Sequence, residues 1–186
     1  FLEYDRTQGY LTELRGGPTL SDVQRTILTK NLFGMDLNGE AVEIARLSCW
    51  IKTAEKGKEL TALDTNIQAG NSVVADPDPL TAWRGRFPAA FAAGGFDAVI
   101  GNPPYVRQEW FSADKPYLKR HYRAFDGVAD LYVYFYELGL GLLKPGGRLG
   151  YIVTNKWMKA GYGEPLRRLY GEAAWVESVI DLGHNK

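Results

Sequence analysis

The amino-acid sequence predicts an α/β fold built around a parallel sheet. Apolar runs of strand length alternate along the chain with apolar residues at helical spacing, which is typical of βαβ units. The chain has 186 residues, enough for one domain, and 45% of them are hydrophobic, enough for an ordinary core. Polar residues follow three of the predicted strands, at the sheet edge where open α/β folds bind ligands.

The first half of the chain predicts a strand–helix–strand unit. Residues 32–36 form a short apolar run that we expect to be a strand. Asn38 is a preferred helix N-cap residue. The helical spacing after it is carried by Ile44, Leu47 and Ile51. Residues 66–69 predict a second strand, which ends at Gly70-Asn71-Ser72.

The second half predicts three further strands and two helices. Residues 75–95 are rich in Pro and Ala, so we expect a surface connection with little regular structure. A helix is expected from Asp130 up to the stop at Lys144-Pro145-Gly146-Gly147, and a shorter helix over residues 164–170. Strands are expected at residues 96–100, as a buried strand, at 149–154 and at 175–181.

Charge and composition restrict the possible partners. The sequence has 22 basic and 22 acidic residues, so any nucleic-acid contact must be a local feature. The single cysteine, Cys49, excludes an internal disulfide, and two distant histidines, His121 and His184, do not predict a metal site. No apolar run has the length of a membrane span and no signal peptide opens the chain, so we expect no membrane partner and a cytoplasmic location.

Four residues just after the predicted strand at 96–100 have a distinctive chemistry: Asn102, Pro103, Pro104 and Tyr105. Asn102 offers an amide oxygen, and Pro103 offers a carbonyl but no N–H. Tyr105 offers a flat ring. Two acceptors and a stacking surface suit a planar amine held at the end of a strand. The alternative is an ordinary Asn-Pro turn.

Asp36, Asn71 and Asn102 each end a predicted strand. Because the carboxyl ends of parallel strands open into one crevice, we expect the three side chains to converge there. An acidic residue in this place commonly holds ribose hydroxyls, Asn71 can bond a base edge, and Asn102 can bond the reacting group. The pattern predicts a nucleoside-containing cofactor beside an acceptor site. The alternatives are a helix N-terminal charge at Asp36 and an Asx-turn at Asn71.

Four stretches together resemble class I S-adenosylmethionine-dependent N6-adenine DNA methyltransferases. The resemblance is to the subgroup with type IIG restriction–modification enzymes and related phage-defence enzymes, and it covers roughly residues 30–186. The stretches are residues 32–47, Gly70-Asn71-Ser72, residues 101–107 and residues 130–157. The resemblance implies a Rossmann-like class I methyltransferase fold. It also implies S-adenosyl-L-methionine as the cofactor, held by Asp36, Leu37, Asn71 and Asn102.

The resemblance implies that Asn102, Pro103, Pro104 and Tyr105 are catalytic. The Asn102 side chain and the Pro103 carbonyl would each accept one hydrogen of adenine N6, which turns the nitrogen lone pair toward the methyl group of the cofactor. Tyr105 would stack on the base. Because a paired adenine cannot be reached, the base must be flipped out of double-stranded DNA. This chemistry requires no metal.

The segment that follows the tetrapeptide is locally basic. Between residues 107 and 123, five Lys and Arg residues oppose two acidic residues, so the local charge is +3, and four aromatic residues are interleaved. The pattern favours contacts with DNA phosphates supported by aromatic rings. The expected contact residues are Arg107, Lys119, Arg120 and Arg123. The alternative is a solvated loop.

The resemblance also sets expectations about the extent of the chain. We expect residues 1–186 to be a partial catalytic domain that lacks the first strand with its glycine-rich loop, the last strand and the target-recognition domain. Phe1-Leu2 resembles the pair that follows such a loop, and Asp181-Leu182-Gly183 resembles the approach to the last strand. Residues 75–95 and 106–129 are expected to be loops or insertions. The isolated chain is expected to bind the cofactor weakly and to be inactive.

Two other functions fit parts of the pattern. Protein N5-glutamine methyltransferases also use Asn-Pro-Pro-Tyr, because a side-chain amide is a planar nitrogen too. They usually lack the basic insert and the helix opening seen at residues 130–135. The second alternative is a non-catalytic methyltransferase-like DNA-binding subunit, and the intact Asn102, Pro103 and Tyr105 argue against it.

Overall fold

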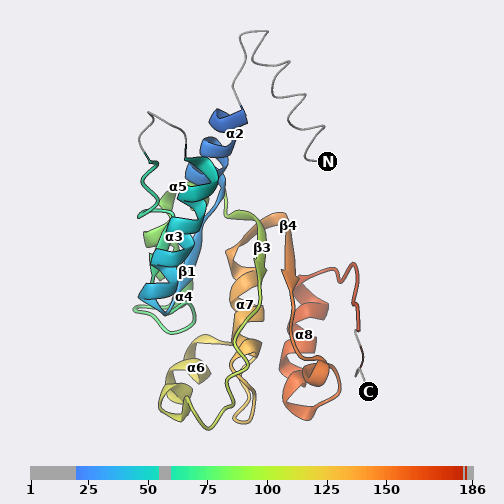
Figure 1. The fold of residues 1–186 in the computed structure, drawn as a ribbon. Helices are drawn as coiled ribbons and strands as arrows, with labels where there is room; N and C mark the ends of the chain where they lie inside the picture. The colour runs from blue at the N-terminus through green and yellow to red at the C-terminus, as the bar shows by residue number, and fades with distance from the viewer. Residues whose placement is uncertain (1–19, 55–59, 182, 184–186) are drawn as a thin grey trace. The chain divides into compact units, whose positions relative to one another are not determined.

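The chain folds as two compact units that divide between Asn71 and Ser72 (Figure 1). The structure, a computed structural model, describes residues 20–54, 60–181 and 183. Each unit holds one pair of parallel strands, and helices alternate with these strands along the chain, which confirms the predicted α/β class. Phe1-Leu2, which resembles the pair after a glycine-rich loop, and Leu182 lie outside the described residues.

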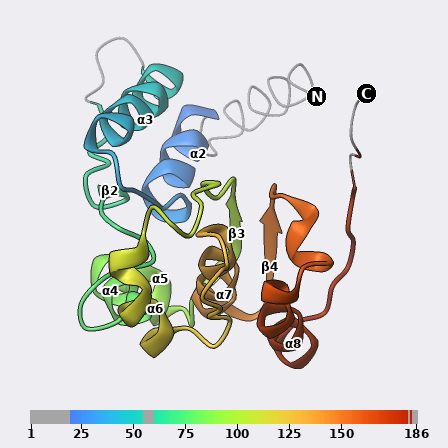
Figure 2. The ribbon, with the colours of Figure 1, turned by 90° about the horizontal axis from the view of Figure 1, so that it is seen from below.

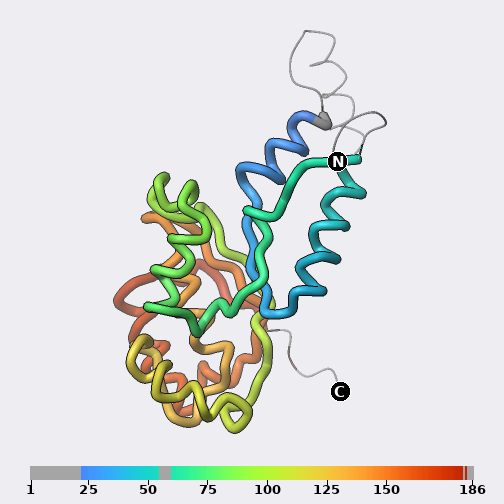
Figure 3. Tube along the Cα trace, turned by 90° about the vertical axis from the view of Figure 1, so that its left-hand side faces the viewer, coloured from blue at the N-terminus to red at the C-terminus, as the bar shows by residue number. Residues whose placement is uncertain are grey.

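The first unit contains a strand–helix–strand motif (Figure 3). Its elements are α2 (Leu20–Thr26), the π-helical turn η1 (Ile27–Asn31), β1 (Gly34–Asp36), α3 (Gly39–Thr53) and β2 (Ile67–Ala69). β1 and β2 pair in parallel, with Gly34 opposite Ile67 and Asp36 opposite Ala69. The strands predicted at 32–36 and 66–69 are therefore confirmed in a slightly shorter form.

Helix α3 begins at its predicted cap and buries one of its two apolar stripes. Asn38 Oδ1 accepts hydrogen bonds from the backbone N–H groups of Glu40 (2.9 Å) and Ala41 (3.3 Å). These bonds satisfy two donors that the first helical turn leaves open.

The small core of this unit consists of Val42, Leu63 and Ile67, with Ala45 and Cys49 against it. The other stripe, Ile44, Leu47 and Ile51, is exposed.

A buried asparagine fixes the approach to β1. Asn66 is 5% exposed, and its Nδ2 donates to the carbonyls of Thr29 (2.9 Å) and Leu32 (3.1 Å). Thr65 Oγ1 donates to Asn66 Oδ1 at 3.1 Å. A buried amide is costly unless its donors and acceptor are paired. This pairing ties the residue before β2 to the segment that leads into β1 and so to Asp36.

The second unit is built around the helix α7, which precedes β4 directly in the chain (Figure 2). The elements are α4 (Pro79–Arg86), α5 (Pro88–Ala92), β3 (Phe96–Gly101), η2 (Ser112–Asp114), α6 (Lys115–His121), α7 (Tyr132–Leu142), β4 (Leu143–Tyr151), η3 (Asn155–Met158), η4 (Gly161–Gly163) and α8 (Glu164–Ala173). β3 and β4 pair in parallel, with Gly101 opposite Tyr151. The helix expected over 164–170 is confirmed, and the one expected from Asp130 begins at Tyr132.

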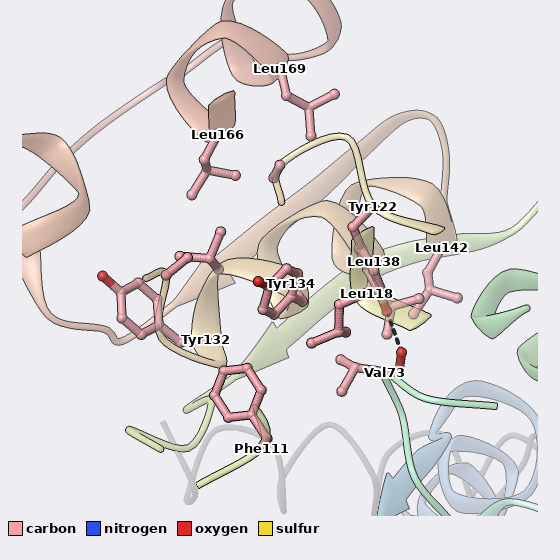
Figure 4. Close-up of a cluster of buried hydrophobic side chains, with 13 residues drawn as sticks. Val73, Phe111, Leu118, Tyr122, Tyr132, Tyr134, Leu138, Leu142, Leu166 and Leu169 are labelled. Carbon is pink, nitrogen blue, oxygen red and sulfur yellow. Dashed lines mark hydrogen bonds between the residues drawn. The ribbon is translucent and has the colours of Figure 1, made fainter. Parts of the chain in front are cut away.

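Buried side chains from α6, α7 and α8 form the core of the second unit (Figure 4). Six of the eleven residues of α7 are buried, so this helix is enclosed on most of its surface. Its partners in the core include Phe111, Leu118, Leu166 and Leu169. Within the described part of the chain, no helix combines the length and the apolar character that crossing a membrane requires.

The prediction that residues 75–95 are irregular is wrong, because they contain α4 and α5. The Asp78 side chain caps α4 by accepting from the backbone N–H of Thr81 at 2.9 Å, and Pro79 occupies the first helical turn. A proline is tolerated there because its missing N–H would have no partner in the helix. Phe87 is buried and its ring centroid lies 5.2 Å from that of Trp83. Pro79 begins α4 and Pro88 begins α5, whereas the prediction took the Pro-rich composition as a sign of irregular structure.

Residues 106–129 are likewise more than a loop, because they include α6 and contribute to the core. Leu118 is fully buried, and the hydroxyl groups of Tyr117 and Tyr122 reach back to the connection that follows Ser72. Tyr122 Oη donates to the carbonyl of Val73 at 2.8 Å, and this bond is buried (Figure 4). The expectation of a loop or insertion is wrong for residues 112–121, which form η2 and α6.

Replacing Tyr122 with Phe is expected to destabilise the second unit by about 1–3 kcal/mol, because the buried hydrogen bond to the Val73 carbonyl is lost. Tyr117→Phe removes the bonds of the Tyr117 hydroxyl to the Ala75 carbonyl and from the Ala75 N–H, in a partly buried place where water can replace them. Its effect should be smaller. Hydrogen exchange of the α6 and α7 amides in the full-length protein measures both effects. A Tyr122→Phe effect no larger than that of Tyr117→Phe would contradict this assignment.

Three expectations about strands are corrected by the structure. Residues 175–181 form no strand; Trp175 is 89% exposed, and these residues pair with no strand among those described. The strand predicted at 149–154 runs instead from Leu143 to Tyr151, and its pairing with β3 is irregular between the Phe96–Leu143 and Ala98–Arg148 pairs. β3 is not a fully buried strand, since Ile100 is 84% exposed. An apolar run shows strand propensity, but burial and pairing depend on which neighbours the fold supplies.

Candidate functional site

The Asn102–Tyr105 tetrapeptide follows the carboxyl end of β3 and is bonded to the end of β4. Tyr105 Oη donates to the carbonyl of Ile152, the residue after β4, at 3.2 Å, and lies 3.5 Å from Asn102 Oδ1. Ile152 N donates to the Gly101 carbonyl at 3.1 Å. Because a phenol has one hydrogen, the shorter bond to Ile152 takes it. The Asn102 amide oxygen is then available to accept from a ligand.

One residue of the tetrapeptide is buried and the other three are exposed. Pro103 is buried, whereas Asn102, Pro104 and Tyr105 are exposed. Tyr105 is 55% exposed, so one part of its ring is packed and another part is open to solvent. The structure therefore presents the amide of Asn102 and the ring of Tyr105 together at a strand end, as the sequence predicted.

The buried Tyr132 of α7 supports the ring of Tyr105. The Tyr105 and Tyr132 rings meet edge to face, with centroids 6.4 Å apart and planes at 63°. Tyr132 is fully buried, and its hydroxyl lies 2.9 Å from that of Tyr162. Burial, and secondly the bond to Tyr162, raises the pKa of Tyr132, and burial raises the pKa of Tyr136 and of Tyr151 to about 12. Tyr132, Tyr136 and Tyr151 therefore stay uncharged at neutral pH, which suits an uncharged aromatic ligand.

The turn after β4 is braced by α8. Arg167 Nη1 donates to the carbonyls of Trp157 (2.6 Å) and Ala160 (3.0 Å). The Trp157 ring packs against those of Tyr136 and Tyr170, with centroid distances of 5.3 and 6.1 Å. η3 is therefore held in a fixed orientation beside the end of β4.

The first unit places two predicted cofactor residues at neighbouring strand ends. Asp36 ends β1 and Asn71 follows β2, and Gly70 N donates to the Asp36 carbonyl at 2.8 Å. Asp36 Oδ1 accepts from Asn38 N at 2.7 Å, and the side chains of Asp36, Leu37 and Asn71 are all exposed. Asn102 belongs to the second unit, so its convergence with Asp36 and Asn71 stays a prediction.

The four cations that the sequence predicted to contact DNA differ in their partners within the protein. All four are exposed, but only the Arg123 guanidinium has an ion-pair partner among the described residues, Glu172. Arg123 also lines a hollow of about 420 Å³ with Asp126, Gly161, Glu164, Pro165, Arg168 and Leu169. Arg123 thus has acidic neighbours within the protein.

The aromatic residues of the same segment also separate into two groups. Phe111 and Tyr122 are buried and belong to the core, so they are not available to nucleic acid. Trp110 is 85% exposed. Trp110 is therefore the residue of this group that is most open to stacking on a base.

Sequence reasoning missed the supporting tyrosines Tyr132 and Tyr162, because they meet through space and nothing in their spacing reveals the contact. Lys156 and Lys159, to which the sequence analysis assigned no role, are exposed cations directly after a predicted strand. Within the residues that the structure describes, no three His, Cys, Asp or Glu side chains form a group that could hold a metal ion.

Comparison with known proteins gives matches along most of the chain. Residues 30–186 match the family described as Eco57I restriction-modification methylase. The type II restriction enzyme and methyltransferase RM.Eco57I of Escherichia coli is 30% identical over 181 residues, which cover 89% of this chain and 18% of that protein. The type II methyltransferase M.XhoI of Xanthomonas vasicola is 49% identical over 92 residues, which cover 47% of this chain and 16% of that protein.

A third relative is likewise matched over only a small part of its length. The type II methyltransferase M.PaeR7I of Pseudomonas aeruginosa is 42% identical over 101 residues, which cover 53% of this chain and 17% of that protein. The chain therefore spans less than a fifth of the length of each of these three relatives.

Proposed function

The chain belongs to the Eco57I restriction-modification methylase family, and from that membership we propose that the protein containing it is a DNA methyltransferase of a restriction–modification system. We propose further that it transfers a methyl group from S-adenosylmethionine to N6 of adenine. The observation that carries the second step is the open amide of Asn102 beside the supported ring of Tyr105. A Rossmann-like class I methyltransferase fold, compatible with the parallel strand pairs, is part of the proposal.

In the proposed reaction, Asn102 and the Pro103 carbonyl bind the two hydrogens of the adenine amine. The N6 lone pair is delocalised into the ring, so the free amine is a poor nucleophile. Two fixed acceptors draw the nitrogen toward tetrahedral geometry and orient its lone pair for in-line attack. The same acceptors would stabilise the positive charge that develops on N6 as its bond to the methyl carbon forms and the sulfur–carbon bond of the cofactor breaks, and N6 would then release one proton to solvent. The hydrogen bond of Tyr105 to Ile152 supports this role, because it leaves Asn102 Oδ1 free to accept.

Tyr105 would hold the base itself. Stacking of a base on an aromatic ring is worth about 1–3 kcal/mol, which is comparable to the few kcal/mol that base flipping requires. The hydroxyl bond to Ile152 and the edge contact with Tyr132 restrict the ring before the base arrives. A ring held in place in advance loses little conformational entropy on binding.

Asp36, Leu37 and Asn71 would hold the nucleoside part of the cofactor. The Asp36 carboxylate is exposed at a strand end, and its Oδ1 is already oriented by the backbone N–H of Asn38. An oriented, open carboxylate fits a ribose diol, which needs an acceptor for its hydroxyl hydrogens. S-adenosylmethionine, when bound, supplies a sulfonium methyl group.

Double-stranded DNA with a flipped adenine is the proposed substrate. Arg107, Lys119 and Arg120 are exposed cations on the segment that follows the tetrapeptide, and Trp110 is an exposed ring on the same segment. Cations of this kind supply the sequence-independent part of DNA affinity.

Labelled cofactor tests the proposal directly. The full-length protein is offered a DNA duplex library and a glutamine-bearing protein in the same reaction. The expected result is label in DNA. Label in a glutamine side chain would instead assign the protein to the glutamine methyltransferases. Label in neither, with intact DNA binding, would favour a non-catalytic subunit.

A further inference from the structure

Most cations of the second unit are engaged with other groups. Acidic partners hold Arg123 (Glu172), Lys144 (Asp97), Arg148 (Glu177) and Arg168 (Glu164). Arg167 bonds backbone carbonyls, Lys115 bonds Gln108 and the Gly127 carbonyl, and Arg84 stacks on Phe91. Five exposed cations have no hydrogen-bond, ion-pair or ring partner for their side chains within the described residues: Arg107, Lys119, Arg120, Lys156 and Lys159.

These five cations lie on two segments that leave the same edge of the strand pair. Arg107, Lys119 and Arg120 follow β3, and Lys156 and Lys159 follow β4. Because β3 and β4 are parallel, both segments begin where Tyr105 bonds the Ile152 carbonyl. Figure 1 shows α6 on one side of α7 and α8 on the other, at the end of the unit toward which the strands run.

Lys156, within η3, and Lys159, the C-cap residue of η3, lie on the same side of this turn. η3 is a 3₁₀ turn that ends at Met158, with Lys159 as its C-cap, and Lys159 N donates to the Lys156 carbonyl at 3.1 Å. With three residues per turn, side chains at positions i and i+3 lie above one another. Trp157, between them in sequence, turns inward against Tyr136 and Tyr170.

Two neighbouring ammonium groups repel each other unless an anion lies between them. The acidic groups near this turn are Asp181, which accepts from Asn155 Nδ2 at 3.3 Å, and Glu164, which pairs with Arg168. Neither of them forms an ion pair with Lys156 or Lys159. A phosphate group of an external ligand would supply the missing anion.

We propose that Lys156 and Lys159 bind backbone phosphates of the DNA on the β4 side of the acceptor site, and that Arg123 takes no part in DNA binding. The inference rests on the proposed function. On the β3 side, Arg107, Lys119 and Arg120 bind the same DNA. The flipped nucleotide then lies between two sets of phosphate contacts, which hold its flanks while the base occupies the site beside Tyr105.

The test is the salt dependence of DNA binding by the full-length protein. Each phosphate contact contributes about 0.9 to the slope of log affinity against log salt concentration. The double variant Lys156→Gln/Lys159→Gln is expected to lower the magnitude of this slope by about 1.8, for target and non-target duplexes alike. Lys144→Gln is the matched control, because Lys144 pairs with Asp97 near the start of β3, and it should leave the slope unchanged. Arg123→Gln should also leave it unchanged.

The possible results distinguish a failure of this inference from a failure of the proposed function. An unchanged slope in a double variant that still binds DNA overturns the inference, and the proposed function stands if that variant still methylates DNA. A reduced slope in a protein that methylates no DNA supports the inference and refutes the proposed function. If the unmodified protein binds no duplex, both are refuted. A slope change for Arg123→Gln as large as for one lysine would overturn the exclusion of Arg123.

Discussion

An Asn102→Ala variant of the full-length protein is expected to methylate DNA at least ~100-fold more slowly than the unmodified protein, the loss found when one preorganised group that stabilises transition-state charge is removed. The amide oxygen of Asn102 is the proposed acceptor for one N6 hydrogen. Its bond to N6 strengthens as positive charge develops on that nitrogen. The loss should therefore appear in the single-turnover rate, with the affinities for DNA and cofactor changed little.

A matched substitution separates this effect from a general loss of structure. Asn31→Ala removes the same side chain at the exposed end of η1, away from the tetrapeptide in the sequence, and should leave the rate unchanged. Equal DNA affinity of the two variants shows that Asn102→Ala is folded. A single-turnover rate for Asn102→Ala within about twofold of the unmodified rate would exclude Asn102 as an acceptor.

Gly163→Ala is expected to disrupt the turn that follows β4. A Cβ atom at Gly163 would lie 1.8 Å from the Trp157 carbonyl oxygen and 2.6 Å from its carbon, so backbone atoms must move apart. Overpacking typically costs about 1–3 kcal/mol, and a clash with backbone atoms belongs at the upper end of that range. The same movement separates Arg167 from the carbonyls of Trp157 and Ala160. Hydrogen exchange in the full-length protein should show lost protection over residues 155–170.

Gly161→Ala provides the control two residues away. A Cβ atom at Gly161 meets no atom within 4 Å, so this variant should keep its protection. If Gly163→Ala and Gly161→Ala show the same exchange, the close approach of Gly163 to Trp157 is not a constraint on the turn. If Gly163→Ala loses protection there, DNA affinity should fall with it, since Lys156 and Lys159 lie on the same turn.

Local features of the fold could be predicted from the sequence because their causes are local. The cap at Asn38 depends on residues two and three positions away, and the strand before Asn102 depends on its own apolar run. The chemistry of the tetrapeptide is likewise contained in four consecutive residues. These are the parts of the site that the structure places as expected.

The features that sequence reasoning missed depend on partners far away in the chain. Arg123 looked available for DNA because Glu172, its partner, lies 49 residues later. Tyr132 supports Tyr105 and bonds Tyr162, 30 residues away. The apolar residues at 175–181 have strand propensity but no strand partner among the described residues. Propensity without a partner does not make a strand.

Nucleoside analysis of DNA after reaction with the full-length protein tests the central claim most directly. DNA is incubated with the protein and S-adenosylmethionine, digested to nucleosides and separated by mass spectrometry. We predict N6-methyladenine with the unmodified protein and none above background with Asn102→Ala. Methylated cytosine in place of N6-methyladenine, or equal amounts of N6-methyladenine from both proteins, would contradict the assignment of Asn102–Tyr105 as an adenine acceptor site.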